Sequence, residues 1–110
     1  MSVRTRRDHT CAWCGRPVAD SETGRKRRYC RQSCRQRAYE QRSAIKGTSI
    51  PDDAVILTAD EVSAAADRAF EVRCAAEDVG TAVTEGADSG ELQRLCAELL
   101  TKARDAERLR

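Results

Sequence analysis

The chain has 110 residues, of which 40% are apolar, 35% charged and 4% aromatic, so one domain fits but a large core does not. It contains no apolar run of about 18 residues, which argues against a membrane-spanning helix, and its Arg-rich N-terminus lacks the apolar stretch of a secretory signal. We therefore expect a cytoplasmic protein with six reduced cysteines, in which clustered thiols indicate metal binding rather than disulfides.

The net charge of +2 conceals opposite charges in the two halves of the chain. Residues 1–46 hold 13 Lys and Arg against 4 Asp and Glu, a net of +9, whereas residues 47–110 hold 7 against 14, a net of −7. Such a division predicts two roles, one of them at a polyanion such as a nucleic acid. Attraction between the two halves is the alternative explanation.

Residues 1–10 show no periodicity and are expected to form a flexible basic arm. Residues 11–46 contain two cysteine pairs, with two residues between the first pair and three between the second. One tight turn can aim both sulfurs of the first pair at a point, and Gly15 suits the positive φ of such a turn. Because zinc accepts four thiolates tetrahedrally, the pattern predicts one structural Zn²⁺ with four metal ligands: Cys11, Cys14, Cys30 and Cys34.

Three alternatives to this zinc site remain open at the level of sequence. The same ligands could hold an iron–sulfur centre, the cysteines could be unrelated buried residues, or His9 could replace one of them. Four protein thiolates leave no open position for a reactive water, so the metal is expected to be structural. A segment shorter than about 40 residues also needs such a staple in order to fold.

The second cysteine pair is expected at the start of a helix, with Ser33 and Gln36 as a capping box. Cys34 would then lie in the first turn, where the helix dipole favours a thiolate. Between the two pairs, Pro17 and Gly24 indicate a β-hairpin. Residues 11–46 are therefore predicted to be a small zinc-stabilised α+β module.

The stretches CAWCG, RRYC and CRQRAY resemble the treble-clef type of four-cysteine zinc finger. This motif is similar to that of a group of small, mostly uncharacterised actinobacterial proteins with the pattern CxxCG…RYCSxxCRQRAYR. The resemblance covers about residues 9–43 and implies a zinc knuckle, a β-hairpin and a helix that supplies the last ligand. Treble clefs serve nucleic acids, proteins and enzymes alike, so the resemblance implies little about function.

Basic residues in this module are expected in the loop between the cysteine pairs and along one helix face, where they could neutralise successive phosphates. Tyr39 could stack on a base, and Trp13 is expected to cover the metal. The candidate nucleic-acid-binding residues are Arg25, Lys26, Arg27, Arg28, Arg31, Arg35, Tyr39, Arg42 and Lys46. A solvated charged face is the alternative, and no register for reading specific bases is evident.

Residues 47–57 are interpreted as a linker because they contain Gly47 and Pro51. A helical pattern then begins with a capping box at Thr58 and Glu61 and runs to about Thr84. The apolar seam expected along this helix consists of Val62, Ala65, Ala69, Val72, Ala76, Val79 and Val83.

A turn over residues 85–90 precedes a second helix capped by Asp88 or Ser89. The expected seam of this helix consists of Leu92, Leu95, Leu99, Ala106 and Leu109, with Cys96 and Ala103 beside it. Residues 58–110 are therefore predicted to form an acidic antiparallel helical hairpin. Phe70 and Leu100 lie off the seam, which predicts a contact with the zinc module, a second copy or another protein.

These features predict a regulatory zinc-finger protein that binds DNA or RNA, with the hairpin for dimerisation or partner docking. The alternative is an adaptor of a transcription or translation complex, in which the finger is a structural platform. The chain has one His, no Ser/His/Asp set and no phosphate-binding glycine loop, so we expect neither an enzyme nor a small-molecule substrate. Cys74 and Cys96 are expected to fill apolar positions, with a redox role as the alternative.

Overall fold

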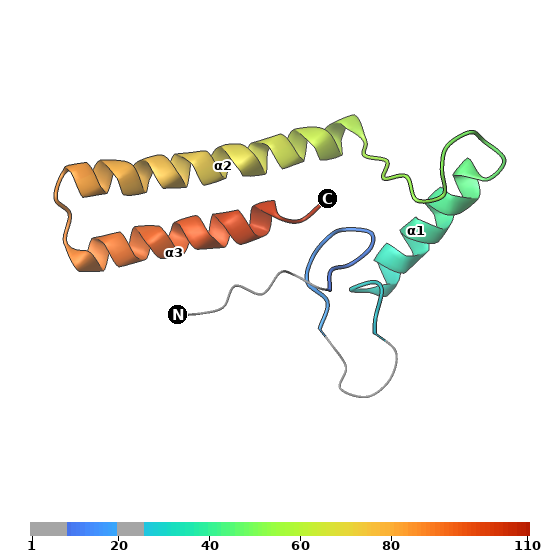
Figure 1. The fold of residues 1–110 in the computed structure, drawn as a ribbon, viewed down its shortest axis with the longest axis horizontal. Coiled ribbons are helices and arrows are strands. Elements are labelled where there is room, and N and C mark those ends of the chain that lie inside the picture. Colours follow the sequence, from blue (N-terminus) through green and yellow to red (C-terminus); the bar gives the residue numbers. More distant parts are fainter. Residues whose placement is uncertain (1–8, 20–25) are drawn as a thin grey trace. The chain divides into compact units, whose positions relative to one another are not determined.

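The computed structural model describes residues 9–19 and 26–110, which contain the helices α1 (Gln32–Ile45), α2 (Ala59–Thr84) and α3 (Ser89–Ala106) (Figure 1). The chain divides into two compact units. One unit comprises Met1–Ile56 together with Leu109–Arg110, and the other comprises Leu57–Arg108. Within the described part of the chain, no helix has an apolar stretch long enough to cross a bilayer.

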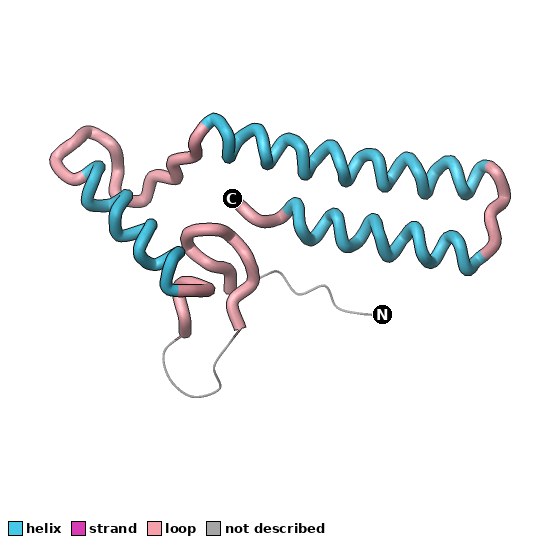
Figure 2. Tube along the Cα trace, turned by 180° about the vertical axis from the view of Figure 1, so that it is seen from behind, coloured by secondary structure: helices cyan, strands magenta, loops and turns pink. Residues whose placement is uncertain are grey.

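The prediction of an α+β module with a treble-clef β-hairpin is wrong. Residues 9–19 and 26–110 contain no strand (Figure 2), and their β structure is limited to an isolated antiparallel bridge between Thr10 and Pro17. Two hydrogen bonds frame this bridge, from the Cys11 amide to the Arg16 carbonyl and from the Val18 amide to the His9 carbonyl. The chain enters the turn of Cys11 and Cys14 directly after the bridge, so no further pairs can follow on that side. The expected hairpin tip at residues 20–25 lies outside the described residues. The described part of the module therefore consists of irregular loops and one helix.

Helix α1 begins at Gln32 and does not use the expected capping box. Its N-cap residue is Arg31, in an extended conformation with no side-chain capping bond, so Ser33 lies inside the helix. The position expected for Cys34, in the first turn, is nevertheless correct. The buried residues of α1 are Cys34, Ala38 and Ile45, which share one helix face because they are spaced by four and seven positions.

Helices α2 and α3 form the predicted antiparallel helical hairpin (Figure 2). At the start of α2, the Thr58 hydroxyl accepts from the Glu61 amide at 3.0 Å, and the Glu61 carboxylate accepts from the Thr58 amide at 2.9 Å. At the start of α3, the Asp88 carboxylate accepts from the Glu91 amide at 2.8 Å. Both capping interactions satisfy amides that have no partner within their own helix.

The inner face of α2 differs from the expected seam at every second position. Ala65, Val72 and Val79 are partly buried, as expected, but the expected positions between and beside them are exposed: Val62, Ala69, Ala76 and Val83. Arg68, Ala75 and Ala82 complete the inner face instead. Arg68 is only 7% exposed. Its charge conceals the true periodicity, because an arginine does not mark a buried position in a sequence.

In α3, Leu95 is buried and Leu92, Leu99, Ala103 and Ala106 are partly buried. These residues form the face of α3 that the sequence predicts. Cys96, expected beside this seam, is exposed. Leu109 follows the end of α3 and belongs to the other compact unit.

A four-cysteine metal centre

The first two sulfur ligands come from a tight turn in the loop that precedes α1. The Gly15 amide donates to the Cys11 carbonyl at 2.9 Å, and the Cys11 amide donates to the Arg16 carbonyl at 2.8 Å. Gly15 has a φ of 79°, a left-handed conformation that favours glycine. The expected turn with a positive φ at Gly15 is therefore confirmed.

The other two sulfur ligands come from the start of α1. Cys30 lies just before the helix and Cys34 lies in its first turn. The Cys30 sulfur lies 3.6 Å from the Cys14 sulfur and 3.7 Å from the Cys34 sulfur. All four sulfurs, of Cys11, Cys14, Cys30 and Cys34, lie within 4.8 Å of one another.

These distances fit one tetrahedral ion. Four sulfurs at about 2.3 Å from a zinc ion are separated from one another by about 3.8 Å. A disulfide would need sulfurs about 2.05 Å apart, and all six cysteines are free thiols. The four cysteines therefore form a site for one structural zinc ion, as the sequence predicts. His9 is not part of this ligand cluster.

The centre is enclosed by its own small core. Cys11, Cys14 and Cys34 are 2–3% exposed and form a buried cluster with Val18. Trp13, Tyr29 and Cys30 pack against this cluster and are partly buried. A metal bound by four thiolates within such a cluster has no open position for a substrate, which suits a structural role rather than a catalytic one.

Main-chain amides favour the thiolate form of the first cysteine pair. Burial opposes ionisation of the Cys11 thiol, but amides, led by those of Cys14 and Cys30, donate to its sulfur and lower its pKa to about 6. Burial also opposes ionisation of Cys14, but the amide and side chain of Arg16 outweigh this effect and lower its pKa. Zinc binds the thiolate, so both shifts prepare these cysteines as ligands.

Cys30 behaves in the opposite way. Burial, together with the neighbouring sulfurs of Cys14 and Cys34, raises the pKa of Cys30 to about 12. A bound dication reverses this effect, because it attracts the sulfurs that otherwise repel one another, and a coordinating thiol is deprotonated outright. The Arg31 side chain donates to the Cys34 sulfur, which raises the pKa of the guanidinium. Arg31 therefore has a role beside the metal as well as a place among the basic candidates.

No known protein family, curated protein or solved structure matched the chain. The resemblance to a particular actinobacterial finger thus gains no support beyond the four-cysteine cluster itself.

Most of the basic candidates lie exposed on α1 or beside its ends. The exposed candidates among the described residues are Lys26, Arg27, Arg28, Arg31, Arg35, Tyr39, Arg42 and Lys46. Arg25 lies outside the described residues. Arg42 donates to the Tyr29 hydroxyl at 3.1 Å, which connects α1 to the loop before it. Arg37 is also exposed on α1, on a different face of the helix from Arg35 and Arg42.

Two further residues contribute to this unit and were not predicted from the sequence, Arg16 and Arg110. Arg16 lowers the pKa of Cys14, as described above. The Arg110 guanidinium lies over the Trp13 ring, with 3.8 Å between the guanidinium carbon and the ring centroid. Arg16 is a loop arginine without a recognisable motif, and Arg110 is separated from Trp13 by 97 positions. No periodicity or spacing rule could have connected them.

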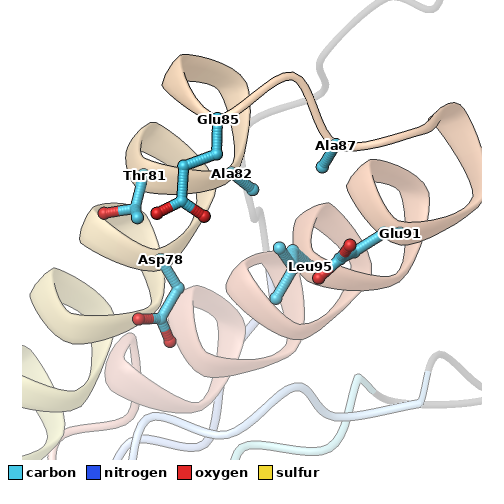
Figure 3. A pocket seen from close by; sticks show the side chains of 7 residues that line it. All are labelled: Asp78, Thr81, Ala82, Glu85, Ala87, Glu91 and Leu95. Atoms are coloured by element: carbon cyan, nitrogen blue, oxygen red, sulfur yellow. The ribbon is translucent and has the colours of Figure 1, made fainter.

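The hairpin unit contains an acidic hollow where α2 and α3 meet at their connecting turn (Figure 3). Its lining includes three carboxylates, those of Asp78, Glu85 and Glu91. These three carboxylates do not lie close enough together to bind one metal ion, and the four cysteines are the cluster that could do so among the described residues. The candidate interaction residues Phe70 and Leu100 are 56% and 50% exposed.

Proposed function

We propose that this protein binds DNA or RNA through the zinc-stabilised unit. In this proposal the zinc ion has a structural role: it holds the fold that presents the basic surface, and it takes no part in catalysis. The observation that supports this proposal is the group of exposed basic side chains on α1 and just before it, the segment that carries Cys30 and Cys34. The four-thiolate site favours a structural role for the metal. We propose that the protein is not an enzyme and that it is located in the cytoplasm.

The basic side chains on α1 are arranged relative to its buried face. Arg35, Arg42 and Lys46 are exposed, whereas Cys34, Ala38 and Ile45 are buried. Arg35 and Arg42 are seven positions apart and therefore lie on one side of the helix, about 10 Å apart along its axis. This spacing lets them contact different phosphates of one backbone.

These basic residues are available to an external anion. No carboxylate among the described residues forms an ion pair with Arg28, Arg35 or Lys46. On the hairpin, by contrast, four ion pairs join a basic residue to an acid three or four positions away. Tyr39 is 60% exposed and presents a ring that could stack on an unpaired base. The binding we propose is electrostatic and tolerant of sequence.

A salt titration tests the proposal most directly. Labelled single-stranded and duplex pools of DNA and RNA are titrated with zinc-loaded protein at several salt concentrations. Replacing Arg28, Arg35, Arg42 and Lys46 with Ser should weaken binding. The slope of log K against log salt should flatten by about one for each lost phosphate contact.

The hairpin provides a matched control, because Arg73 and Arg94 are exposed arginines on α2 and α3. Replacing these two with Ser removes charge without touching the proposed surface and should leave the slope unchanged. The proposal fails if the zinc-loaded protein shows no salt-dependent binding to any pool at low ionic strength. Equal effects per substitution in the two sets would also contradict it, because they would indicate that net charge alone determines binding.

A second candidate function is supported by the exposed apolar residues of the hairpin. Phe70 and Leu100 are large apolar side chains on the two helices of the hairpin, and each exposes at least half of its surface. We propose that the hairpin docks a second copy or another protein through these residues. If nucleic-acid binding fails, the adaptor function with a zinc-stabilised platform becomes the better proposal.

A further inference from the structure

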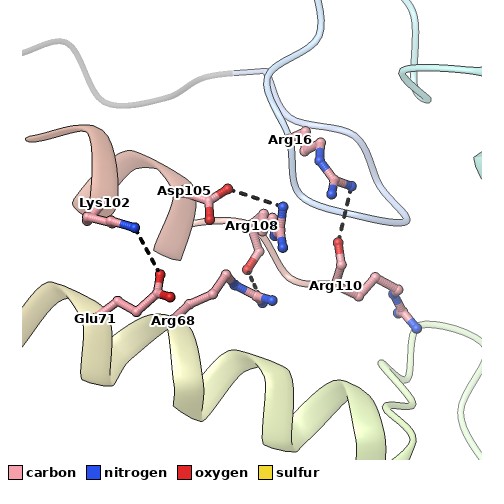
Figure 4. Close-up of polar contacts among 7 residues, drawn as sticks. All are labelled: Arg16, Arg68, Glu71, Lys102, Asp105, Arg108 and Arg110. Atoms are coloured by element: carbon pink, nitrogen blue, oxygen red, sulfur yellow. Dashed lines mark hydrogen bonds and ion pairs between the residues drawn. The ribbon is translucent and has the colours of Figure 1, made fainter. Parts of the chain in front are cut away.

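The last two residues of the sequence are bound to the turn that supplies two of the metal ligands. Leu109 and Arg110 follow α3 but belong to the same compact unit as the metal centre. Both of their main-chain amides donate to the Cys14 carbonyl, at 2.7 and 3.3 Å. The Arg16 side chain donates to the main-chain oxygen of Arg110 at 3.2 Å (Figure 4). The backbone of this dipeptide is therefore fixed on a metal-ligating residue.

The side chain of Arg110 contacts an aromatic ring and two carbonyl oxygens, which together suit a guanidinium. Its Nε donates to the Trp13 carbonyl at 2.8 Å, and its Nη1 donates to the Ile56 carbonyl at 2.9 Å. Its central carbon lies 3.8 Å from the centroid of the Trp13 ring, well inside the range of about 6 Å for a cation–π interaction. The guanidinium is thus bound by an aromatic face and by two carbonyl oxygens at once.

This arrangement selects arginine over other residues. A guanidinium is planar and carries several donors in a fixed fork, so it can lie flat on a ring while it donates in two directions. A lysine ammonium has a single nitrogen and cannot place two separated donors beside the ring in this way. A neutral side chain would lose the attraction to the ring face.

We propose that Trp13, Cys14 and Ile56 form an arginine-binding site and that Arg110 occupies this site as an intramolecular ligand. The ligand class is an arginine residue within a peptide. The main-chain amides of this arginine and of the residue before it bind the site together with the guanidinium. The Trp13 and Cys14 carbonyls belong to the metal-ligating turn, so the site depends on the fold of that turn. This inference does not depend on nucleic-acid binding.

The tether makes Arg110 an inhibitory occupant. A ligand attached to the same chain acts at an effective concentration on the order of millimolar, so it outcompetes a free arginine peptide present at a lower concentration. An external arginine-bearing segment gains access only when Arg110 is absent or displaced. Trp13 is the single tryptophan of the chain, and its fluorescence therefore reports on the site.

Acrylamide quenching of Trp13 in the zinc-loaded protein tests whether the site is occupied. Arg110→Ala should increase the quenching constant by about two-fold, because the guanidinium no longer covers the ring. Arg110→Lys should give an intermediate value. Arg104→Ala is the control, since Arg104 is an exposed arginine in the last turn of α3. Zinc content and helical circular dichroism are measured for each variant, and if Arg110→Ala loses zinc, Arg110→Lys decides the test.

Peptide addition tests whether the site binds arginine as a ligand. N-acetyl-Leu-Arg-amide, at about ten millimolar, should return the quenching of Arg110→Ala toward the wild-type value. Wild type should be unchanged, because a guanidinium covers the Trp13 ring whether Arg110 or the peptide supplies it. The same peptide with citrulline, which keeps the shape and lacks the charge, should have no effect. Equal quenching of wild type, Arg110→Ala and Arg110→Lys would overturn the docking. Equal responses to the two peptides, or no response to either, would overturn the arginine-binding site.

Discussion

The Arg68 guanidinium donates through Nη2 to the main-chain oxygen of Arg108 at 3.3 Å, which joins the first half of α2 to the residue two positions beyond α3 (Figure 4). Arg68 is the one charged residue among the buried residues of the described chain. Its Nε is enclosed and has no hydrogen-bond partner. A buried guanidinium with an unsatisfied nitrogen and no ion pair with a described carboxylate loses more hydration than it recovers.

We therefore predict that Arg68→Leu preserves or increases the stability of the hairpin, by up to about 1 kcal/mol, because it removes this desolvation and keeps apolar volume. Arg68→Ala should instead lower stability by about 1 kcal/mol or more, because it also removes the packing of the arginine stem. Thermal unfolding followed by circular dichroism distinguishes the two. A large loss of stability in Arg68→Leu would show that the hydrogen bond to Arg108 outweighs the burial cost.

Loss of one ligand should unfold the zinc unit and spare the hairpin. Zinc contributes on the order of 10 kcal/mol to the folding of short modules that cannot build a core of their own. Cys30→Ser should therefore abolish stoichiometric zinc binding, measured by elemental analysis, while most of the helical signal of α2 and α3 persists. Cys96→Ser is the matched control, because Cys96 is exposed on α3 and should leave one zinc per chain. Absence of zinc from freshly purified, reduced wild type would contradict the metal site.

The exposed apolar residues of the hairpin should mediate self-association. Phe70 is 56% exposed even though the Arg73 guanidinium carbon lies 5.1 Å from its ring centroid, so much of the side chain is open to solvent. Phe70→Glu and Leu100→Glu should each shift sedimentation toward the monomer at high protein concentration, with little change in helicity. Ala64→Glu introduces the same charge at an exposed position of α2 and should have no such effect. A wild type that is monomeric at every concentration would exclude this interface between copies.

The sequence predicts local features of this protein well where the chemistry is confined to a few neighbouring residues. Capping at Thr58 and Asp88, the positive φ of Gly15 and the convergence of two cysteine pairs all follow from short spacings. The β-hairpin prediction is wrong because pairing among the described residues stops at one bridge, beside the turn of Cys11 and Cys14. The resemblance that implied a hairpin carried no information about this local geometry. Contacts such as Arg110 with Trp13 join distant positions, and no local pattern encodes them.

The structure and the apolar periodicity of the sequence differ in which residues of α2 face α3. Ala82 and Val83 are adjacent in α2, but Ala82 is 7% exposed and Val83 is 61% exposed. The apolar periodicity predicts that Val83 lies in the seam, whereas the structure places Ala82 there, next to Leu95 at the acidic hollow. Because adjacent helical residues point about 100° apart, a substitution can affect one position and spare the other.

Ala82→Glu should lower the free energy of unfolding of the hairpin by about 2–3 kcal/mol. The new carboxylate would be buried, and it would lie among Asp78, Glu85 and Glu91, whose like charges raise the cost further. Val83→Glu should change the free energy of unfolding by no more than about 0.5 kcal/mol, because the side chain stays in solvent. Urea unfolding followed by circular dichroism measures both. The reverse order of effects would restore the seam that the sequence predicts and would require α2 to be rotated by about one residue.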